Sequence, residues 1–529
     1  MSSIMYAAIY YGQQNLHYLL FIFLAGVIYV GATVFYRLYL SPLSKFPGPK
    51  IAAATRLYET YFQLLRGGTF TWHIETLHDQ YGPVVRISPW EIHVKDPDFY
   101  HVLYAGPGKH RNKDPWFSFI AYPLSLFSTA SHELHRPRRR VLAEFFKKKS
   151  VYELEPLIKD NLRKLCHHFS TVISGSTVIE LHAAFYSFAV DVLSQYAFGT
   201  SDGFHYLDMH EVPDTWKMRM TSLFGFCRIN RHFPMLVVGA RLIPTLAAWF
   251  VPPLAHVFQM EKDVKKCVHR VRQSYRQSGD KQSSNVPELE SHLPKTIYPS
   301  ILANPDVPES EKELRRLEDD AIFLLMAGTD APGQVLAITA FHVLNNPRVL
   351  QRLREELSSA IPDPSTLPDL VDLERLPYLS AVIKEGFRLS SVVTTRLPRS
   401  APDEDLYYGD WIIPAGTFVS MSTYFILRDP NIFPQPSKFI PERWELCPTE
   451  LQRLEKYLLP ASKGTLGCLG QNLAWAWMYH VLAALFRRFE MKLYQTEERH
   501  AEMARDNFIG QTEAGMNNIK VTVLEECSL

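Results

Sequence analysis

The first 36 residues of the chain contain no lysine, arginine, aspartate or glutamate. Within them, residues 16–36 are almost wholly apolar and approach the ~20 residues that a helix needs to cross the hydrocarbon of a bilayer. A cleaved signal peptide would have a basic start and a shorter apolar run. This segment therefore predicts a membrane-spanning helix, with a buried core helix as the alternative.

The charges that follow this helix predict its orientation. Arg37, Lys45 and Lys50 all lie on its C-terminal side, and the positive-inside rule then places the body of the protein in the cytosol. Residues 1–15 would form a short lumenal N-terminus, and the endoplasmic reticulum is the expected membrane. Three prolines in residues 37–50 favour a stiff extended linker over a helix.

The bulk composition predicts one large folded domain over residues 51–529. The chain has 529 residues, 47% hydrophobic and 21% charged, as in ordinary globular proteins. We find no repeat or flexible linker that would divide it. Its 56 basic and 55 acidic residues nearly cancel, so nucleic acid is not an expected partner. The six cysteines lie far apart, unlike those of a disulfide scaffold or a zinc site.

The periodicity of the apolar residues predicts a mainly α fold with a minor β region. Residues 52–290 are expected to be mostly helical, with a polar loop at 278–295. Further helices are predicted at 311–346, 348–361, 378–389 and 471–489, and a small sheet at 405–422.

A glycine-rich turn carries Cys468. It runs from Gly464 to Gly470 and directly precedes the predicted helix 471–489. Free amides and the helix dipole at such a position favour a thiolate, and glycines let a flat ligand approach the backbone closely. Cys468 is therefore a candidate metal ligand. The alternative is a small buried hydrophobic residue.

Two further motifs hold charged residues. Glu385 and Arg388 lie three apart on a predicted helix and can pair on one face, and Arg443 could join the same carboxylate. In isolation such a pair is usually a solvated salt bridge that contributes little to stability.

The order of these motifs resembles that of the cytochrome P450 family, over nearly the whole chain. It comprises Glu385-x-x-Arg388, Pro441-Glu442-Arg443-Trp444 and Gly464-x-x-x-Cys468-x-Gly470. The segments Ala327-Gly328-Thr329-Asp330 and Asp429-Pro430-x-x-Phe433 also fall where that family has related motifs. Within the family, the closest resemblance is to fungal secondary-metabolism members, including the trichodiene-oxygenase-like group. It rests on the sequence Thr395-Arg396-Leu397-Pro398-Arg399. The resemblance implies a cytochrome P450 fold preceded by a transmembrane helix.

The resemblance also implies a cofactor, haem b, with Cys468 as its axial thiolate. His135, Arg139 and Arg396 would approach the haem propionates, while Gly464 and Gly470 would lie close to the cofactor. The roles that the family gives to Glu385, Arg388 and Arg443 are structural. The basic run at 136–140 could instead be a solvated face or a contact for an acidic reductase surface.

On the same resemblance, Asp330 belongs to the water chain that delivers protons for dioxygen cleavage. Three positions depart from the family pattern. Ala331 replaces a threonine hydroxyl, so water, Thr329 or a substrate hydroxyl would have to substitute. Leu466 replaces an arginine that contacts a propionate, and Ala461 replaces an aromatic residue that shields the thiolate.

The implied activity is oxidation of a lipophilic small molecule, such as a terpenoid or polyketide, with dioxygen. Electrons would come from NADPH through a membrane-bound flavoprotein reductase, with cytochrome b5 as an optional donor. Val392 to Thr395 would line the substrate pocket. The alternatives are a haem-thiolate isomerase or dehydratase, and a non-catalytic haem-binding membrane protein. The first alternative rests on Ala331.

Overall fold

A computed structural model describes residues 2–118, 121–173, 177–280 and 295–527. The predicted loop at 278–295 lies mostly outside these ranges, and its first residues instead end a long helix. The helices are α1 (Ser2–Phe35), α2 (Lys50–Ala54), α3 (Leu57–Thr60), α4 (Phe70–Tyr81), α5 (Tyr100–Leu103), α6 (His132–Ala143), α7 (Lys148–Glu153), α8 (Glu155–Thr171), α9 (Leu181–Phe198), α10 (Thr215–Gly225), α11 (Cys227–His232), α12 (Pro234–Leu242), α13 (Pro244–Phe250), α14 (Pro253–Asp280), α15 (Ile297–Ala303), α16 (Leu314–Leu344), α17 (Pro347–Ala360), α18 (Leu370–Leu373), α19 (Pro377–Ser390), α20 (Thr423–Ile426), α21 (Pro448–Glu455) and α22 (Gln471–Arg488).

The four predicted helices beyond residue 310 are confirmed within a few residues as α16, α17, α19 and α22. Helices α16 and α17 are separated at Asn346 and Pro347. Pro347 begins α17, and the side chain of Asn346 caps it by accepting a hydrogen bond from the amide of Val349.

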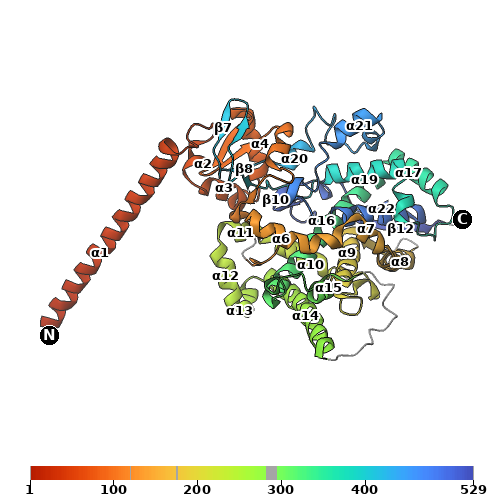
Figure 1. Cartoon of the computed structure of the whole chain (residues 1–529), viewed down its shortest axis with the longest axis horizontal. Helices are drawn as coiled ribbons and strands as arrows, with labels where there is room; N and C mark the ends of the chain where they lie inside the picture. Colours follow the sequence, from red (N-terminus) through yellow and green to blue (C-terminus); the bar gives the residue numbers. More distant parts are fainter. Residues whose placement is uncertain (1, 119–120, 174–176, 281–294, 528–529) are drawn as a thin grey trace.

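The apolar N-terminal helix α1 projects away from the folded body (Figure 1). Within His17–Leu40, a stretch of 18 residues has a mean hydropathy of 2.3, and no residue of the span is buried, as expected of a helix in a lipid environment. Helix α16 is also long and apolar enough to cross a membrane, but it is mostly buried by other helices and is a core helix of the body.

The proline-rich segment after α1 packs against the body, which corrects the prediction of an extended linker. Residues Tyr36–Leu40 form a π-helical turn. Leu43 and Phe46 are buried, and the Phe46 ring stacks on Trp411 at 5.0 Å. Apolar side chains on both sides of the prolines therefore join this segment to the adjacent sheet instead of leaving it as a spacer.

The strands form four small sheets. A five-stranded sheet has the order β1-β2-β8-β5-β3, and the other three are β4-β12-β9, β10-β11 and β6-β7. The bounds are β1 (Val84–Ser88), β2 (Glu91–Val94), β3 (Asn112–Lys113), β4 (Val178–Glu180), β5 (Arg399–Ser400), β6 (Leu406–Tyr408), β7 (Trp411–Ile413), β8 (Phe418–Ser420), β9 (Phe489–Leu493), β10 (Arg505–Asn507), β11 (Ile509–Gln511) and β12 (Lys520–Glu526). The sheet predicted at 405–422 is confirmed as β6, β7 and β8, although β8 belongs to the large sheet.

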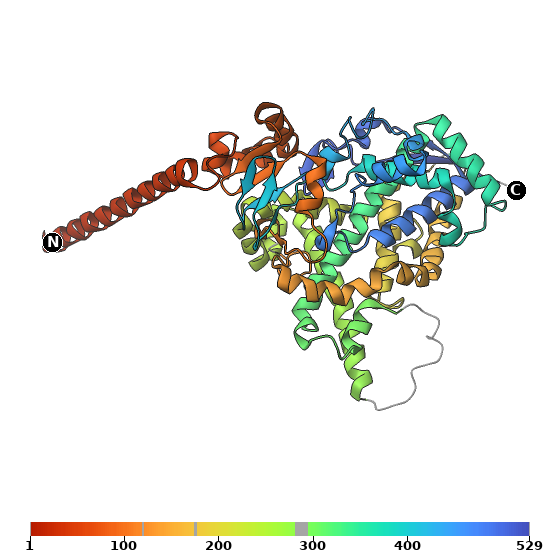
Figure 2. The same ribbon diagram turned by 45° about the horizontal axis from the view of Figure 1, so that its top comes forward.

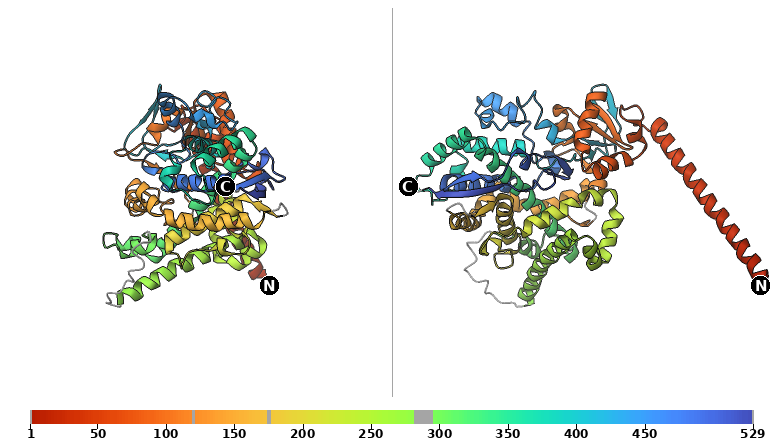
Figure 3. Two further views of the ribbon diagram at one scale, coloured as in Figure 1. Left: turned by 90° about the vertical axis from the view of Figure 1, so that its right-hand side faces the viewer. Right: turned by 180° about the vertical axis from the view of Figure 1, so that it is seen from behind.

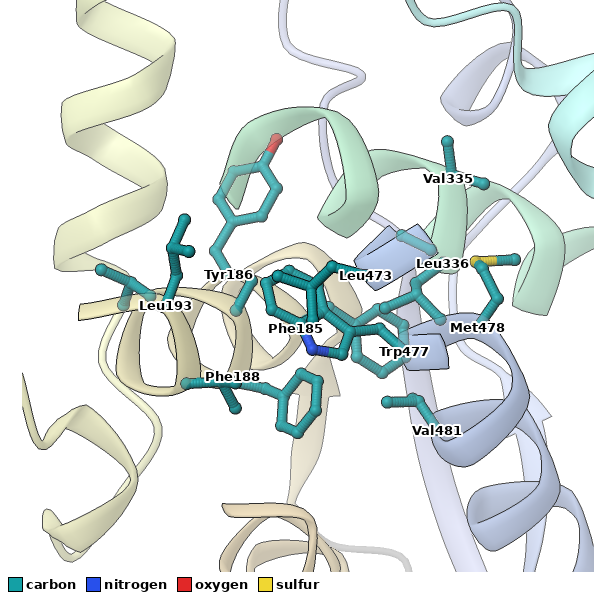
Figure 4. Close-up of a cluster of buried hydrophobic side chains, with 14 of the residues drawn as sticks. Phe185, Tyr186, Phe188, Leu193, Val335, Leu336, Leu473, Trp477, Met478 and Val481 are labelled. Atoms are coloured by element: carbon teal, nitrogen blue, oxygen red, sulfur yellow. The ribbon is translucent and has the colours of Figure 1, made fainter. Parts of the chain in front are cut away.

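Helix α16 lies at the centre of the helical part and packs against α9, α14, α19 and α22. Figure 2 and Figure 3 show the helices stacked beside the sheets. The close-up in Figure 4 shows Phe185 and Phe188 of α9 near Trp477 of α22 and Leu336 of α16. This rigid core fixes the positions of α16 and of the turn that precedes α22. The sequence motifs converge on these two elements.

Candidate active site

The turn that carries Cys468 is held in a conformation that only glycine tolerates well. Gly464 has φ = +75°, and a Cβ there would lie 2.2 Å from the carbonyl oxygen of Ala105. The amide of Cys468 donates to the carbonyl of Ala461 at 2.8 Å. At Gly470, a Cβ would meet no described atom within 4 Å outside its own chain neighbours, which leaves room beside the turn for a flat ligand.

The Cys468 side chain is accessible, although it lies deep enough for burial to raise its pKa. Both observations hold for a thiol that opens onto an internal hollow. A backbone hydrogen bond from Gly470 and the charge of Arg139 lower the pKa, but burial is the larger influence. The turn before α22 therefore does lower the pKa of the free thiol, as predicted, but by less than burial raises it. A bound metal ion would supply the missing stabilisation.

Four basic side chains from three elements gather beside this turn. Lys113 lies on β3, His135 and Arg139 on α6, and Arg399 on β5. Burial lowers the pKa of each of the four, and the positive charges of the others lower those of Lys113 and His135 further, the latter to about 2. We call these residues the cationic cluster.

The cationic cluster has no acidic partner among the described residues. The ammonium of Lys113 donates only to carbonyl oxygens, those of Leu126 and Phe127, at 3.1 and 2.7 Å. Arg399 donates to its neighbour Pro398, and its buried Nε has no partner. Uncompensated buried cations are costly. The lowered pKa values relieve part of this cost, since His135 with a pKa of about 2 is neutral in the free protein. The cluster therefore favours an anionic ligand, such as a carboxylate or phosphate, that would offset the remaining positive charge.

Arg396 does not belong to this cluster, which corrects the prediction that it approaches a propionate. Its guanidinium is 2% exposed and pairs with two carboxylates. Nε lies 2.7 Å from Glu91 Oε1, and a terminal nitrogen lies 2.9 Å from Glu59 Oε2. Two buried negative charges thus already compensate Arg396. Arg399, three residues later, lies in the cluster instead. Neither Arg399 nor Lys113 was among the predicted site residues.

Glu385, Arg388 and Arg443 meet as predicted, with Glu385 and Arg388 buried and Arg443 half-buried. Glu385 and Arg388 are fully buried and form a bidentate pair with distances of 2.8 and 2.9 Å. Arg443 Nε donates to Glu385 at 3.1 Å, and Trp444 Nε1 donates at 3.0 Å. Arg388 also donates to the carbonyl oxygens of Leu427, Pro436 and Lys438. Because Glu385 and Arg388 are fully buried, the alternative of a solvent-exposed salt bridge is excluded. The network instead joins α19 to the chain segment that precedes Cys468.

One face of α16 is accessible although the helix is otherwise enclosed. Ala327 is exposed, and Phe323 and Ala331 are half-buried. These residues are four apart and so share a face. An exposed alanine in the middle of a core helix indicates a hollow beside it. Ala331 lies on this face, so the position that lacks the family's threonine does border the hollow.

Thr329 lies on a different face and cannot substitute for the missing hydroxyl. It is fully buried, donates to the carbonyl of Leu325 at 2.7 Å and accepts from Trp216 Nε1 at 2.8 Å. Both of its hydrogen-bonding roles are therefore used within the protein. The prediction of a catalytic role for Thr329 is wrong, and its observed contacts join α10 to α16.

Asp330 is a buried acid that titrates near neutrality. Burial raises its pKa to about 7, while hydrogen bonds from Tyr186 and Gln334 lower it. Tyr186 donates to Oδ1 at 2.8 Å, and Gln334 donates to Oδ2 at 2.9 Å. No basic side chain pairs with it among the described residues. Asp330 can therefore hold or release a proton at physiological pH.

Three aromatic rings from distant segments meet beside the hollow. Phe127 stacks on Phe323 of α16 at 4.6 Å and meets Phe508 edge-on at 5.4 Å. Phe508 has φ = +81°, and its amide donates to Asp506 Oδ1 at 3.0 Å. The buried Asp506 thus holds the β10-β11 turn that presents Phe508. Among the predicted pocket residues, Thr394 is used to bind the same carboxylate.

The residues around the hollow have the chemistry that haem requires. Cys468 would bind the iron, the cationic cluster would receive the two propionates, and the alanine face of α16 would lie over the ring. Leu466 brings no further charge to the cluster. The arginines of the basic run at 136–140 have different surroundings. Arg136 and Arg140 are exposed, and Arg138 pairs with Glu311 at 3.1 Å. Among the arginines of this run, Arg139 alone contributes to the cationic cluster.

Comparisons with known proteins agree with this assignment. The family model of cytochrome P450 matches residues 53–516. The chain is 36% identical over 94% of its length to cytochrome P450 monooxygenase sdnE of Sordaria araneosa, covering 96% of that protein. It is 38% identical over 88% of its length to conidiogenone synthase PchP450 of Penicillium rubens, covering 91%. It is also 34% identical over 94% of its length to cytochrome P450 monooxygenase TRI4 of Fusarium sporotrichioides, covering 95%. The chain therefore belongs to the cytochrome P450 family and is an oxygen-incorporating oxidoreductase of the monooxygenase type.

Proposed function

We propose that the protein is a membrane-anchored haem-thiolate monooxygenase that oxidises a lipophilic small molecule of secondary metabolism, such as a terpenoid or polyketide. The observation that carries the proposal is the position of Cys468. Its accessible thiol lies beside the partly buried cationic cluster, which has no acidic partner among the described residues. Fungal secondary-metabolism relatives support the substrate class.

Haem b would be held by Cys468 at the iron and by Lys113, His135, Arg139 and Arg399 at the propionates. When bound, a haem with an axial thiolate supplies the cleavage of dioxygen. The backbone amide of Gly470 donates a hydrogen bond to the Cys468 sulfur, which lowers the pKa of the thiol and so stabilises the thiolate. Helix α16 and the cysteine turn would keep bulk water away from the reacting region.

Asp330 is the proposed proton donor of the distal side. Its Tyr186 hydrogen bond favours the charged carboxylate, so Tyr186→Phe should raise the pKa of Asp330 above 7. A step that needs the protonated carboxyl group to donate its proton should then persist to higher pH. The pH profile of product formation measures this shift, and an unchanged profile would exclude Asp330 as the titrating group.

Ala331 sets the coupling between NADPH and product. With Thr329 fully bonded elsewhere, water or a substrate hydroxyl must take the place of the missing threonine. We expect part of the reducing equivalents to leave as hydrogen peroxide, and Ala331→Thr should lower the peroxide yield per NADPH. Unchanged coupling in this variant would contradict the argument.

The substrate is proposed to lie against Phe127, Phe323 and Phe508, whose rings offer apolar surface with a fixed geometry. Phe323→Ala should weaken binding of the natural substrate without altering haem content. The spin-state change of the haem on substrate addition would report the affinity.

The protein is proposed to reside in the endoplasmic reticulum membrane, with a single span and a cytosolic catalytic domain. Helices α12 and α13 expose an apolar surface on the side of the body from which α1 extends (Figure 1). Leu242, Trp249 and Phe250 are the most prominent of its side chains. This surface would rest on the same membrane that α1 crosses. Arg136 and Arg140 remain free to meet the acidic surface of a flavoprotein reductase or of cytochrome b5.

The direct test is product formation in membranes that contain the protein, an NADPH-dependent flavoprotein reductase and a panel of terpenoid and polyketide substrates. Substrate-dependent NADPH consumption with transfer of labelled oxygen into the product would support the proposal. Binding of haem without any oxygen transfer would favour the non-catalytic haem protein.

A second candidate is a haem-thiolate isomerase or dehydratase, which needs no reductase. The observation that favours it is Ala331, since reactions without dioxygen do not need the missing hydroxyl. Product formation in the absence of reductase and NADPH would establish this activity, and strict dependence on the reductase would exclude it.

A further inference from the structure

A second group of potential ligands lies beside the cationic cluster. His110 precedes β3, while His132 and Glu133 begin α6. The rings of His110 and His132 have centroids 4.7 Å apart, and His110 Nε2 lies 3.8 Å from Glu133 Oε1. One ligand atom from each of the three side chains can be chosen so that all lie within 4.8 Å of one another.

Two imidazoles and a carboxylate are a ligand set that Zn²⁺ prefers, with water in the fourth position. Ligand atoms on a tetrahedral zinc ion are about 3.4 Å apart, given Zn–N bonds of about 2.0–2.1 Å. The distance of 3.8 Å between His110 Nε2 and Glu133 Oε1 is already close to this value, and the remaining approach requires rotation of side chains. His110 and Glu133 can make that rotation because 46% and 79% of their side chains are exposed.

Two further features point to a metal ion. Asp403 Oδ2 lies 2.6 Å from His110 Nδ1, which orients Nε2 toward Glu133. A carboxylate on the far nitrogen of a ligand histidine is the usual support of a zinc site. The ring of His132, 8% exposed, forms no hydrogen bond with any residue that the structure describes, and its backbone is fixed through Asn112.

We propose that His110, His132 and Glu133 bind one Zn²⁺ ion, with Asp403 orienting His110. The ligands lie on the segments that carry Lys113 and Arg139, and Asp403 follows the strand that carries Arg399. A bound ion therefore ties together the three segments that form the cationic cluster. The site is separate from Cys468 and does not rest on the proposed function.

The test uses the full-length, haem-loaded protein in detergent, without a histidine tag and after removal of metals. A Cys447→Ser background removes an exposed thiol that could bind zinc elsewhere. Titration with Zn²⁺ against a chromophoric chelator should show one ion per chain. His132→Ala and Glu133→Gln should each weaken binding at least tenfold, and Asp403→Asn by about 10- to 100-fold.

His269→Ala is the matched control, because His269 is an exposed histidine with a carboxylate partner, Glu318 at 2.8 Å, but no second histidine. It should leave zinc affinity unchanged. Glu133 is mostly exposed, so Glu133→Gln tests the site even if His132→Ala fails to fold. An affinity that is unaffected by Glu133→Gln, or lowered equally by His269→Ala, would overturn the proposal.

A second readout tests whether the ion ties the segments together. Zn²⁺ should slow amide hydrogen exchange in residues 110–113 and 399–403 of the unaltered protein, and should have no such effect in Glu133→Gln. Equal exchange rates with and without Zn²⁺ would overturn the proposed tie. Neither measurement involves turnover, so failure of the monooxygenase proposal would leave both results interpretable.

Discussion

Arg396 and Arg399 are three residues apart and both are buried, but their surroundings are opposite. Arg396 is enclosed by the carboxylates of Glu59 and Glu91, which raise its pKa despite burial. Arg399 lies among Lys113 and other basic groups, and burial lowers its pKa. The charge of Arg396 is therefore paired within the protein, whereas the charge of Arg399 has no acidic partner among the described residues and would be paired by a bound anion.

This difference separates structural from ligand-binding charges. A compensated buried ion pair is strongly destabilised when one partner is removed, because the remaining charge stays buried. An uncompensated charge costs stability until its ligand arrives, so its removal should harm ligand binding and not folding. Substitutions at the two arginines should therefore give opposite patterns.

The largest effect is expected for Arg396→Leu. It leaves Glu59 and Glu91 without their shared partner, and the free energy of unfolding should fall by about 3–5 kcal/mol. Denaturant unfolding measures this change. As a control, Arg348→Leu removes an exposed arginine that faces Glu442 and should cost less than about 0.5 kcal/mol. Equal effects of the two substitutions would remove the basis of the comparison.

Arg399→Leu should leave the haem-free protein at least as stable as the unaltered one. The rate of haem loss should instead rise about tenfold or more, since a charge-assisted bond of about 1.5–3 kcal/mol to a propionate is lost. Transfer of haem to an acceptor protein measures the rate. Arg136→Leu, an exposed position on α6, should not change it. If Arg399→Leu lowered the free energy of unfolding and left the rate of haem loss unchanged, Arg399 would stabilise the fold as Arg396 does, and the distinction would fail.

Low pH should weaken the ion pair between Glu59 and Arg396. Burial raises the pKa of Glu59, but Arg396 and its neighbours lower it to about 2 overall, below the ordinary 4.5. The stabilisation from this pair is therefore complete above about pH 4.5 and is lost as the pH falls toward 2. Thermal unfolding between pH 6 and 3 should show a smaller pH dependence in Glu59→Gln, and an identical slope would contradict the pairing.

Leu466→Arg should have the smallest effect. It adds a cation near the propionate site where the family commonly has one, so haem loss should slow by a few-fold. Because the new charge also lacks an acidic partner, the haem-free protein should gain no stability. An unaltered rate of haem loss would show that the cationic cluster is already sufficient.

The sequence predicted the elements that depend on local spacing. Glu385 and Arg388 share a helical face by their separation, and Cys468 is identified by its glycine turn. The helical period also separates Thr329 from the accessible face of α16. Ala327 and Ala331 are four apart and share a face, whereas Thr329 lies two positions from each, which turns it away from that face.

The sequence could not distinguish Arg396 from Arg399, because the decisive carboxylates lie hundreds of residues earlier in the chain. Lys113 and Phe508 gave no local signal for a similar reason. Lys113 reaches the site through the pairing of β3 with β5. Phe508 depends on a turn with positive φ that the distant contacts of Asp506 stabilise.

The absorption spectrum of the reduced, carbon-monoxide-bound protein tests the haem-thiolate assignment most directly, because a thiolate opposite carbon monoxide shifts the main haem band strongly to the red. The account predicts this shifted band for the unaltered protein and its loss in Cys468→Ala, with the fold of both verified by circular dichroism. A folded protein that binds no haem, or that shows an unshifted band, would contradict it.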